Sequence, residues 1–161
     1  MITNKIFCNH FKTNLTFDEI NIILENTKHI KYKYHNGQPI MIYLKLFENE
    51  HINLYHSHRF IFFTKGTLNT VNYLNQLINF DFIQSLNLKS ITATYNLNKR
   101  IILSQLKGVV YEPEIFPAAY IKPSPSVHIN IFASGKVVIM GMKKESDLQS
   151  LINIVIQIVS K

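Results

Sequence analysis

Short stretches of alternating hydrophobic and polar residues recur along the chain, with apolar residues at helical spacing between them. The alternating stretch 2–12 is followed by Thr16, a favourable N-cap residue. Helical spacing then holds for Phe17, Ile20, Ile23 and Leu24. Because a period of two marks a strand and a period near 3.6 marks a helix, this region predicts a strand that leads into a helix.

A tight turn between two further alternating stretches predicts a hairpin. Residues 29–34 and 40–47 flank Asn36 and Gly37, a dipeptide that tolerates the positive φ angles of a two-residue hairpin turn. Another pair of strands and a closing helix with an apolar stripe are predicted at 53–55, 60–63 and 67–80.

Two parts of the sequence match each other at one constant offset of 77 residues. Residues 34–45 align with 111–122 through three identities. At the same offset, residues 52–61 align with 129–138, with aromatic over aromatic and cation over cation. The same alignment offset holds for separate segments, which indicates an internal repeat.

The second half accordingly predicts the same order of elements as the first. Its strand pair turns at Ser134-Gly135, where glycine relieves the turn, and its last helix starts near Ser146. We infer a tandem duplication in which residues 1–80 and residues 81–161 form two repeats of one pseudo-twofold domain.

Large apolar side chains recur on both faces of the predicted strands. Antiparallel strands with helices at their joints predict an α+β fold with one continuous sheet. Side chains alternate across such a sheet, so one set faces the helices and the other faces away. The helix-facing set is Ile40, Ile42, Leu44, Leu46, Val127, Ile129, Ile131, Val137 and Ile139. The other set is Met41, Tyr43, Lys45, Phe47, His128, Asn130, Phe132, Val138 and Met140. An apolar second face indicates a ligand, a dimer contact or a covering loop, because monomers rarely expose such a patch.

Composition and charge narrow the classes of protein. The 161 residues carry 17 basic and 10 acidic side chains, a formal net charge of +7, and are 47% hydrophobic. This length fits one compact globular domain or two small halves that share a core, and it excludes a multidomain enzyme. Cys8 is the single cysteine, so no internal disulfide is expected, and no signal-like or membrane-spanning apolar run is present. We expect a soluble intracellular protein with a polyanionic partner and no membrane partner.

The cations of the predicted strands lie among apolar residues and apart from the acids. Acidic residues fall mainly in predicted helices and loops. The strand cations are Lys31, Lys33, Lys45, Arg59, Lys122 and Lys136. An apolar strip edged by cations suits the minor groove of DNA, whose floor is sugar and base edge and whose rims are phosphate. The chemistry therefore favours a nucleic-acid-binding surface.

Two motifs of the second half resemble a known family. Residues 111–117 read YEPEIFP and residues 129–141 read INIFASGKVVIMG, which strongly resemble the second repeat of the TATA-box-binding protein family. The resemblance extends more weakly over the whole chain, with Ile83-Gln84 at the opening of the second repeat and Asn4 on the first. It implies a saddle of ten antiparallel strands and four helices, whose concave face binds an AT-rich minor groove.

The resemblance assigns wedge and groove-floor roles to the second half. Phe116 and Phe132 match the two phenylalanines that pry open a base step at one end of the DNA site. Pro117, Val138 and Met140 fall at neighbouring groove-floor positions.

The resemblance also implies phosphate contacts and a protein partner. The cations that match phosphate-reaching positions are Lys122, Lys136 and Lys143. Such cations set affinity and salt dependence rather than sequence choice. The loop with Glu112, Glu114 and Ile115 resembles the segment that the family presents to the transcription factor TFIIB.

The first half departs from the family pattern at its wedge positions. By the internal offset, Pro39 stands at the first wedge position and Tyr55 at the second. Asn4 keeps the central groove-floor asparagine, whereas Ser85 stands at its partner position, with Asn87 two residues away if the strand slips in register. Proline offers less stacking area than phenylalanine, so the preferred DNA element is expected to differ from an ordinary TATA box. The remaining predicted DNA contacts of this half are Ile6, Lys45, Arg59 and Ile61.

Simpler interpretations stand beside these assignments. His56 and His58 share one side of a strand, yet no third ligand has matching spacing, which favours a turn or a phosphate contact over a metal site. Glu112 and Glu114 flank Pro113 in an extended loop without a nucleophile, so we expect neither an enzyme nor a cofactor. Phe116 and Phe132 could instead be core residues; alternation and the resemblance together favour the DNA-facing role.

The resemblance implies a general transcription initiation factor that bends AT-rich promoter DNA. It would recruit a TFIIB-like factor and, through it, the RNA polymerase machinery, and would act in the nucleus or in a viral factory or virion. The divergence and the Ile, Asn and Lys richness suggest a viral or parasite source. A rival hypothesis is an interaction module that uses the saddle to bind a protein. A saddle domain of a DNA glycosylase is disfavoured, because no catalytic helical domain accompanies it.

Overall fold

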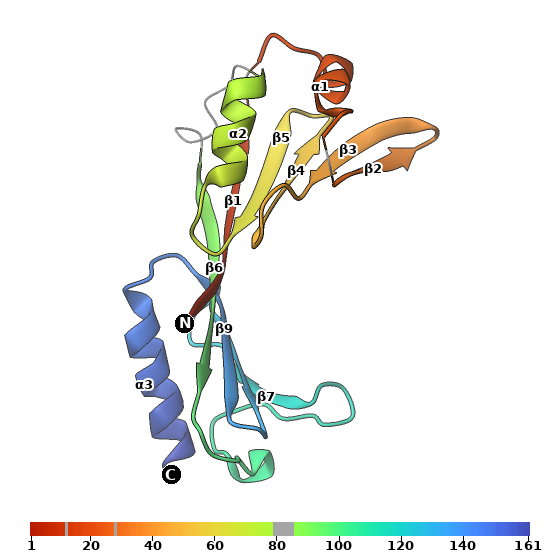
Figure 1. Cartoon of the computed structure of the whole chain (residues 1–161). Coiled ribbons are helices and arrows are strands. Elements are labelled where there is room, and N and C mark those ends of the chain that lie inside the picture. The colour runs from red at the N-terminus through yellow and green to blue at the C-terminus, as the bar shows by residue number, and fades with distance from the viewer. Residues whose placement is uncertain (12, 28, 79–85) are drawn as a thin grey trace. The chain divides into compact units, whose positions relative to one another are not determined.

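The computed structural model describes residues 1–11, 13–27, 29–78 and 86–161 (Figure 1). Its strands are β1 (Ile2–His10), β2 (Ile30–His35), β3 (Gln38–Leu44), β4 (Glu50–Tyr55), β5 (Arg59–Thr64), β6 (Leu88–Asn96), β7 (Ala118–Ile121), β8 (His128–Phe132) and β9 (Lys136–Met142). Its helices are α1 (Phe17–Leu24), α2 (Asn69–Ile78), the short 3-10 helix η1 (Leu103–Gln105) and α3 (Asp147–Val159).

The strands form one sheet, which confirms the predicted α+β class. They hydrogen-bond in the order β2-β3-β4-β5-β1-β6-β9-β8-β7, nine strands in all within the described residues. The resemblance implied ten. Next to β7, where a tenth strand would lie, the chain makes only an isolated antiparallel bridge between Val110 and Tyr120. Gly108 adopts a positive φ angle of +74°, which interrupts the extended backbone just before that bridge.

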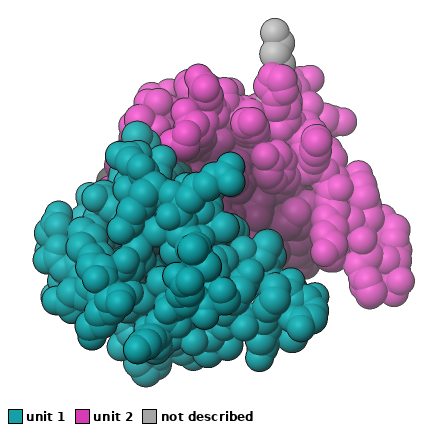
Figure 2. All heavy atoms as spheres, turned by 90° about the horizontal axis from the view of Figure 1, so that it is seen from below, with its two compact units in different colours: residues 1–4, 90–161 teal, residues 5–89 magenta. Residues whose placement is uncertain are grey.

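Two compact units divide the chain (Figure 2). Unit 1 comprises Met1–Asn4 and Ser90–Lys161, and unit 2 comprises Lys5–Lys89. Strand β1 contributes to both: the Thr3 hydroxyl donates to the Thr92 carbonyl at 3.2 Å within unit 1, and the Cys8 amide donates to the Asn87 carbonyl at 3.0 Å within unit 2. The predicted boundary at residues 80 and 81 lies outside the described residues.

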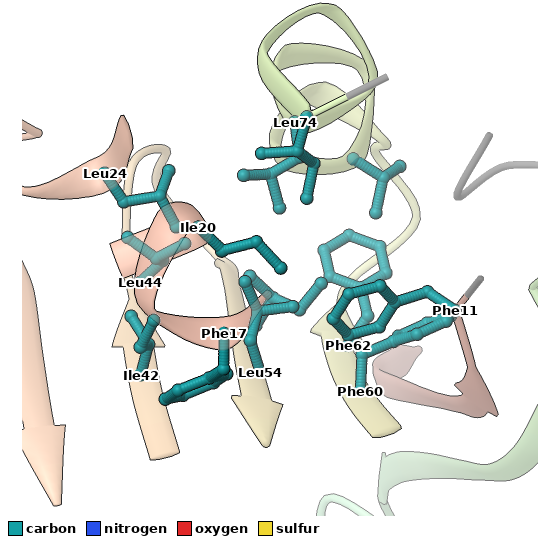
Figure 3. Packing of buried hydrophobic residues seen from close by; sticks show 13 residues of the cluster. Phe11, Phe17, Ile20, Leu24, Ile42, Leu44, Leu54, Phe60, Phe62 and Leu74 are labelled. Carbon is teal, nitrogen blue, oxygen red and sulfur yellow. The ribbon is translucent and has the colours of Figure 1, made fainter. Parts of the chain in front are cut away.

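In unit 2, α1 and α2 pack their apolar sides against the sheet (Figure 3). Helix α1 begins after Thr16, whose hydroxyl accepts from the Glu19 amide at 3.2 Å while the Glu19 carboxylate accepts from the Thr16 amide at 2.7 Å. This reciprocal capping box fixes the predicted start of the helix. Asn36 and Gly37 have φ angles of +48° and +77°, which confirms the predicted hairpin turn. The buried cluster includes Phe17, Ile20, Leu24, Ile42, Leu44, Leu54, Phe60, Phe62 and Leu74.

In unit 1, α3 covers one face of the sheet. Its buried residues are Leu151, Ile152 and Val155. The strand residues predicted to face the helices are buried as well: Val127, Ile129, Ile131, Val137 and Ile139. Unit 2 has an eight-residue helix after its first strand, whereas the corresponding stretch of unit 1 forms only the three-residue η1. The second half therefore does not repeat the first helix that the duplication predicted.

Two turns that lie 77 residues apart share their backbone geometry. The Gly135 amide donates to the Phe132 carbonyl at 2.9 Å, and the His58 amide donates to the Tyr55 carbonyl at 2.9 Å. Gly135 has a φ angle of +85°, and a Cβ there would overlap the Lys99 carbonyl oxygen. His58 adopts +54° without being glycine, a conformation that costs a non-glycine residue about 1–2 kcal/mol. The first half thus keeps the turn although it lacks the glycine.

A buried carboxylate ties β4 to the start of α2. Glu50 is 1% exposed, and its carboxylate accepts from the Asn69 amide at 3.0 Å and from the Thr70 amide at 2.6 Å. Burial alone would raise the pKa of Glu50, but hydrogen bonds from Thr67, Thr70 and Asn69 outweigh it and hold that pKa below its ordinary value. The carboxylate therefore caps the helix as an anion, where the helix dipole favours negative charge.

Replacing Glu50 with glutamine should destabilise the protein by about 1–2 kcal/mol at pH 7, because the amide keeps the shape but loses the charge-assisted bonds. A carboxyl whose folded pKa is depressed stabilises the fold above its unfolded pKa of about 4.3, and this contribution disappears as pH falls through the folded pKa. The difference between wild type and Glu50→Gln in urea unfolding should therefore shrink from pH 7 to pH 3. Glu25→Gln, at an exposed position, is the matched control. An equal difference at both pH values would contradict the assignment.

Candidate nucleic-acid interface

Unit 1 presents a sheet face of mixed apolar and uncharged polar side chains on the side away from α3. Strand alternation and the antiparallel register place the members of this face opposite the buried set. We call it the open face of unit 1, and it comprises Thr92, Thr94, Tyr120, His128, Asn130, Phe132, Val138 and Met140. All except Tyr120 are half-buried, and Tyr120 is exposed.

Two phenylalanines meet at the end of this face. The rings of Phe116 and Phe132 lie edge to face, with centroids 6.1 Å apart and planes at 64°. Phe116 is 40% exposed, and the small side chain of Ala118 lies opposite Phe132 in the register of β7 and β8. Neither ring is among the buried core residues, so the interpretation of these two residues as core is not supported.

The loop before Phe116 presents the predicted partner-binding residues. The amides of Ile115 and Phe116 both donate to the Glu112 carbonyl, at 3.0 and 2.9 Å, which closes the loop. Glu112 and Glu114 are exposed, and Ile115 is 78% exposed. An exposed isoleucine beside two carboxylates is available to a protein surface, and Pro117, also exposed, follows Phe116 in the chain.

Cations, without carboxylates, accompany the open face of unit 1. Strands β6 to β9 contain no Asp or Glu residue. Lys136 is exposed at the start of β9 and lies opposite Asn96 in the register, and Lys143 is exposed just after β9. Lys122 is exposed after β7 and lines a cavity that Ile154 of α3 also lines. Three lysines and no strand carboxylate therefore accompany this face, a charge arrangement that favours a polyanionic ligand.

Unit 2 has its own open face, on the side of β1 to β5 away from α1 and α2. It comprises Ile6, Pro39, Met41, Tyr43, His51, Asn53, Tyr55, Ile61 and Phe63, all of them half-buried. The predicted wedge residues of this half, Pro39 and Tyr55, are both half-buried. Tyr55 lies opposite Met41 in the register, and Pro39 lies opposite Tyr34.

An aromatic cluster on this second face was not predicted from the sequence. The ring of His51 stacks on Phe63 with centroids 4.2 Å apart and planes at 14°, and it lies 5.4 Å from the ring of Tyr43. Burial, and then the nearby Lys45 cation, lowers the pKa of His51. The alternation of His51, Asn53 and Tyr55 along one strand is the signal that could have placed His51 on this face.

The other predicted contacts of the first half lie in different places. Arg59 is exposed, and its Nε donates to the Cys8 sulfur at 3.1 Å, which fixes the guanidinium beside β1 within unit 2. Lys45 is exposed directly after β3. Asn4 is half-buried and belongs to unit 1, and Ser85 lies outside the described residues.

The two histidines of the β4–β5 turn pack against aromatic rings. His56 lies 5.2 Å from the ring of Phe17, and His58 lies 5.3 Å from the ring of Phe11. In the described part of the chain, no group of three or more His, Cys, Asp or Glu side chains could hold a metal ion. Within the same residues, no helix is both long and apolar enough to cross a membrane.

Comparison with known proteins points to one family. The family model "Transcription factor TFIID (or TATA-binding protein, TBP)" matches residues 85–161. A TATA-box-binding protein 3 from Methanosarcina acetivorans is 44% identical over 63 residues, which are 38% of this chain and 34% of that protein. A TATA-box-binding protein from Pyrobaculum calidifontis is 38% identical over 76 residues, which are 44% of this chain and 38% of that protein. The matched region thus spans little more than a third of either relative.

A solved structure is similar over nearly the whole chain. Methanococcus jannaschii TBP aligns with a TM-score of 0.74 at 24% sequence identity, covering 99% of this chain and 97% of that chain. At this identity, the likeness shows a common fold. It extends the similarity to the first half, beyond the residues that the family model matches.

The stacked environment of His51 predicts an unusual titration. Its ring should protonate below the ordinary value of about 6.5, as measured by NMR of the ring protons across pH. Lys45→Gln should raise the pKa of His51 by removing the neighbouring cation. A histidine whose pKa is lower in the folded state binds a proton more readily in the unfolded state. Its contribution to stability is therefore present above the unfolded pKa, and the free energy of unfolding should fall as pH drops from 7 towards 5. An unchanged His51 pKa in Lys45→Gln would rule out the charge contribution.

Proposed function

Since the chain is a member of the TATA-binding protein family, with the family's domain in residues 85–161 and the family's fold along its length, we propose that it is a transcription initiation factor that binds AT-rich promoter DNA in the minor groove. The relatives named above are TATA-box-binding proteins, and binding of that kind is proposed for the present chain. No catalytic step is part of this function.

The observation that carries the proposal is the aromatic pair of unit 1. Phe116 and Phe132 contact each other outside the core, on a face whose strands contain no carboxylate. Exposed aromatic surface costs free energy in water, so a ligand that covers it is favoured. A base step that opens against these rings covers them, and the cost of unstacking is a few kcal/mol.

In minor-groove binding, apolar and charged residues would have different roles. Val138 and Met140 would contact sugars and base edges on the groove floor, while Lys136 would reach a phosphate. Charge then supplies affinity and its salt dependence, whereas the wedge supplies the bend. The deformability of the base step at the wedge selects the sequence, because TA and CA steps unstack most easily.

The two units would contribute unequally to the bend. Unit 1 carries a pair of phenylalanines in contact, whereas unit 2 offers a proline and a tyrosine, Pro39 and Tyr55, at the corresponding positions. We therefore propose that the second half drives the kink and that the first half mainly follows the backbone through Arg59 and Lys45. This inequality would orient the protein on its DNA and would change the preferred element from an ordinary TATA box.

A protein partner fits the loop beside the wedge. The exposed Glu112, Glu114 and Ile115 offer two carboxylates and one apolar anchor on a closed turn. We propose a TFIIB-like factor as its partner, with the polymerase machinery recruited through that factor. The proposed place of action is the nucleus, or the transcription compartment of a virus if the source is viral.

Removing both rings should reduce DNA bending more than non-specific affinity. We expect Phe116→Ala with Phe132→Ala to lower the bend angle of an AT-rich duplex, measured by fluorescence energy transfer between its ends, because the wedge is lost while the cations remain. Tyr73→Ala, which removes an exposed aromatic on α2, is the matched control. Unchanged bend and affinity in the double variant would eliminate the wedge assignment.

Removing a phosphate contact should act through salt. Lys136→Ala should weaken binding to AT-rich and GC-rich duplexes alike and reduce the slope of log K against log salt by about 1. Lys65→Ala, at an exposed loop position, should leave the slope unchanged. If the wild type shows no preference for AT-rich DNA and its binding depends little on salt, the result would instead support the rival function, a protein-binding module.

A further inference from the structure

A groove lies beside the C-terminal part of α3 in unit 1, at the edge of the sheet formed by β7, and Tyr120 of β7 also lines it. Its first lobe has a volume of about 470 Å³ and is lined by apolar residues, with Val110, Ile121, Ile154 and Ile158 among them. Its second lobe has a volume of about 270 Å³ and is also lined by Ile158, which joins the two. Both volumes arise from residues of a single unit.

The groove follows from two places where unit 1 lacks an element that the other unit has. The stretch 97–110 forms only η1 in place of a full helix, and the edge segment beside β7 makes only the Val110 bridge. A helix and a complete edge strand would cover more of the flank of α3. Ile102 remains 62% exposed in the second lobe, and Val110 is 42% exposed at the rim of the first.

Charge at the groove has one sign. Lys122 lines the first lobe, and Lys99, Arg100 and Lys161 line the second. Among the described residues, no Asp or Glu lines either lobe. An occupant therefore needs apolar groups for the first lobe and negative charge for the rim and the second lobe.

The edge of the sheet favours a polypeptide as that occupant. Beyond the bridge at Val110, the register leaves Gly108 opposite Lys122, and there is open space around Gly108 where a side chain would project. An extended peptide can approach such a backbone edge and place alternate side chains into pockets. We propose that the groove binds a short acidic segment of a partner protein, with leucine or phenylalanine side chains in the apolar lobe and carboxylates at Lys99 and Arg100.

A synthetic peptide of defined composition tests this proposal on the whole chain. The probe is a fluorescein-labelled ten-residue peptide that alternates aspartate with leucine and phenylalanine, and binding is read by anisotropy at physiological salt. We expect saturable binding, and a loss of about tenfold or more when asparagine replaces aspartate or when serine replaces the apolar residues. Absent binding of the probe, or equal binding of either altered peptide, would overturn the proposal.

Variants locate the binding site. Lys99→Glu with Arg100→Glu should weaken the probe by about tenfold or more through charge reversal, and Ile158→Trp should weaken it similarly by filling the place where the two lobes meet. Matched controls are Lys65→Glu with Lys144→Glu, which make the same charge change elsewhere, and Ile22→Trp, at an exposed position of unit 2. Control variants that lose as much affinity as the groove variants would overturn the proposal.

Two further measurements distinguish peptide binding in the groove from DNA binding and from self-association. The groove variants should retain the DNA bend of the wild type, so failure of the DNA-binding proposal is measured independently. Sedimentation tests for a second copy of the chain in the groove. A dimer that Ile158→Trp abolishes, together with absent peptide binding, would assign the groove to self-association and overturn the peptide proposal.

Discussion

The alternation of side chains along antiparallel strands is the constraint on which the rest of this structure depends. One set of side chains must be buried against helices, and here that set is almost wholly aliphatic and aromatic. The second set then has no helix to cover it. Because it is also rich in large apolar residues, the fold carries a surface that water disfavours, and function follows from what covers that surface.

Electrostatics determines which ligand fits such a surface. The only carboxylate within the described strands β1 to β9 is Glu50, and it faces the helices, where it caps α2. The open faces therefore combine apolar area with cations, while the acids lie in helices and loops. This segregation leaves the strands favourable to a polyanion, while the acidic Glu112–Ile115 loop lies outside them.

The two halves differ in ways that matter physically. The second half has an aromatic pair and a glycine turn, and it has only the three-residue η1 where the first half has helix α1. The first half has a capped helix, a positive φ at His58 in its turn, and His51 stacked on Phe63 on its open face. Unequal halves give the molecule a direction, which a symmetric one would lack, and the shortened helix leaves the groove beside α3.

Local pattern determined much of this protein. Period-two alternation placed Ile129, Ile131 and Val137 in the core and Phe132 and Val138 on the other face, because a strand offers only two sides. Thr16 marked a helix start and Asn36-Gly37 a hairpin, since both act through neighbouring backbone. What only the tertiary structure decided depends on residues distant in sequence: the contact of Phe116 with Phe132, the stacking of His51 on Phe63, and the capping of α2 by Glu50. The failure of residues 97–110 to form a full helix also required the fold, because apolar spacing alone does not supply the cap and the packing partners that a short helix needs.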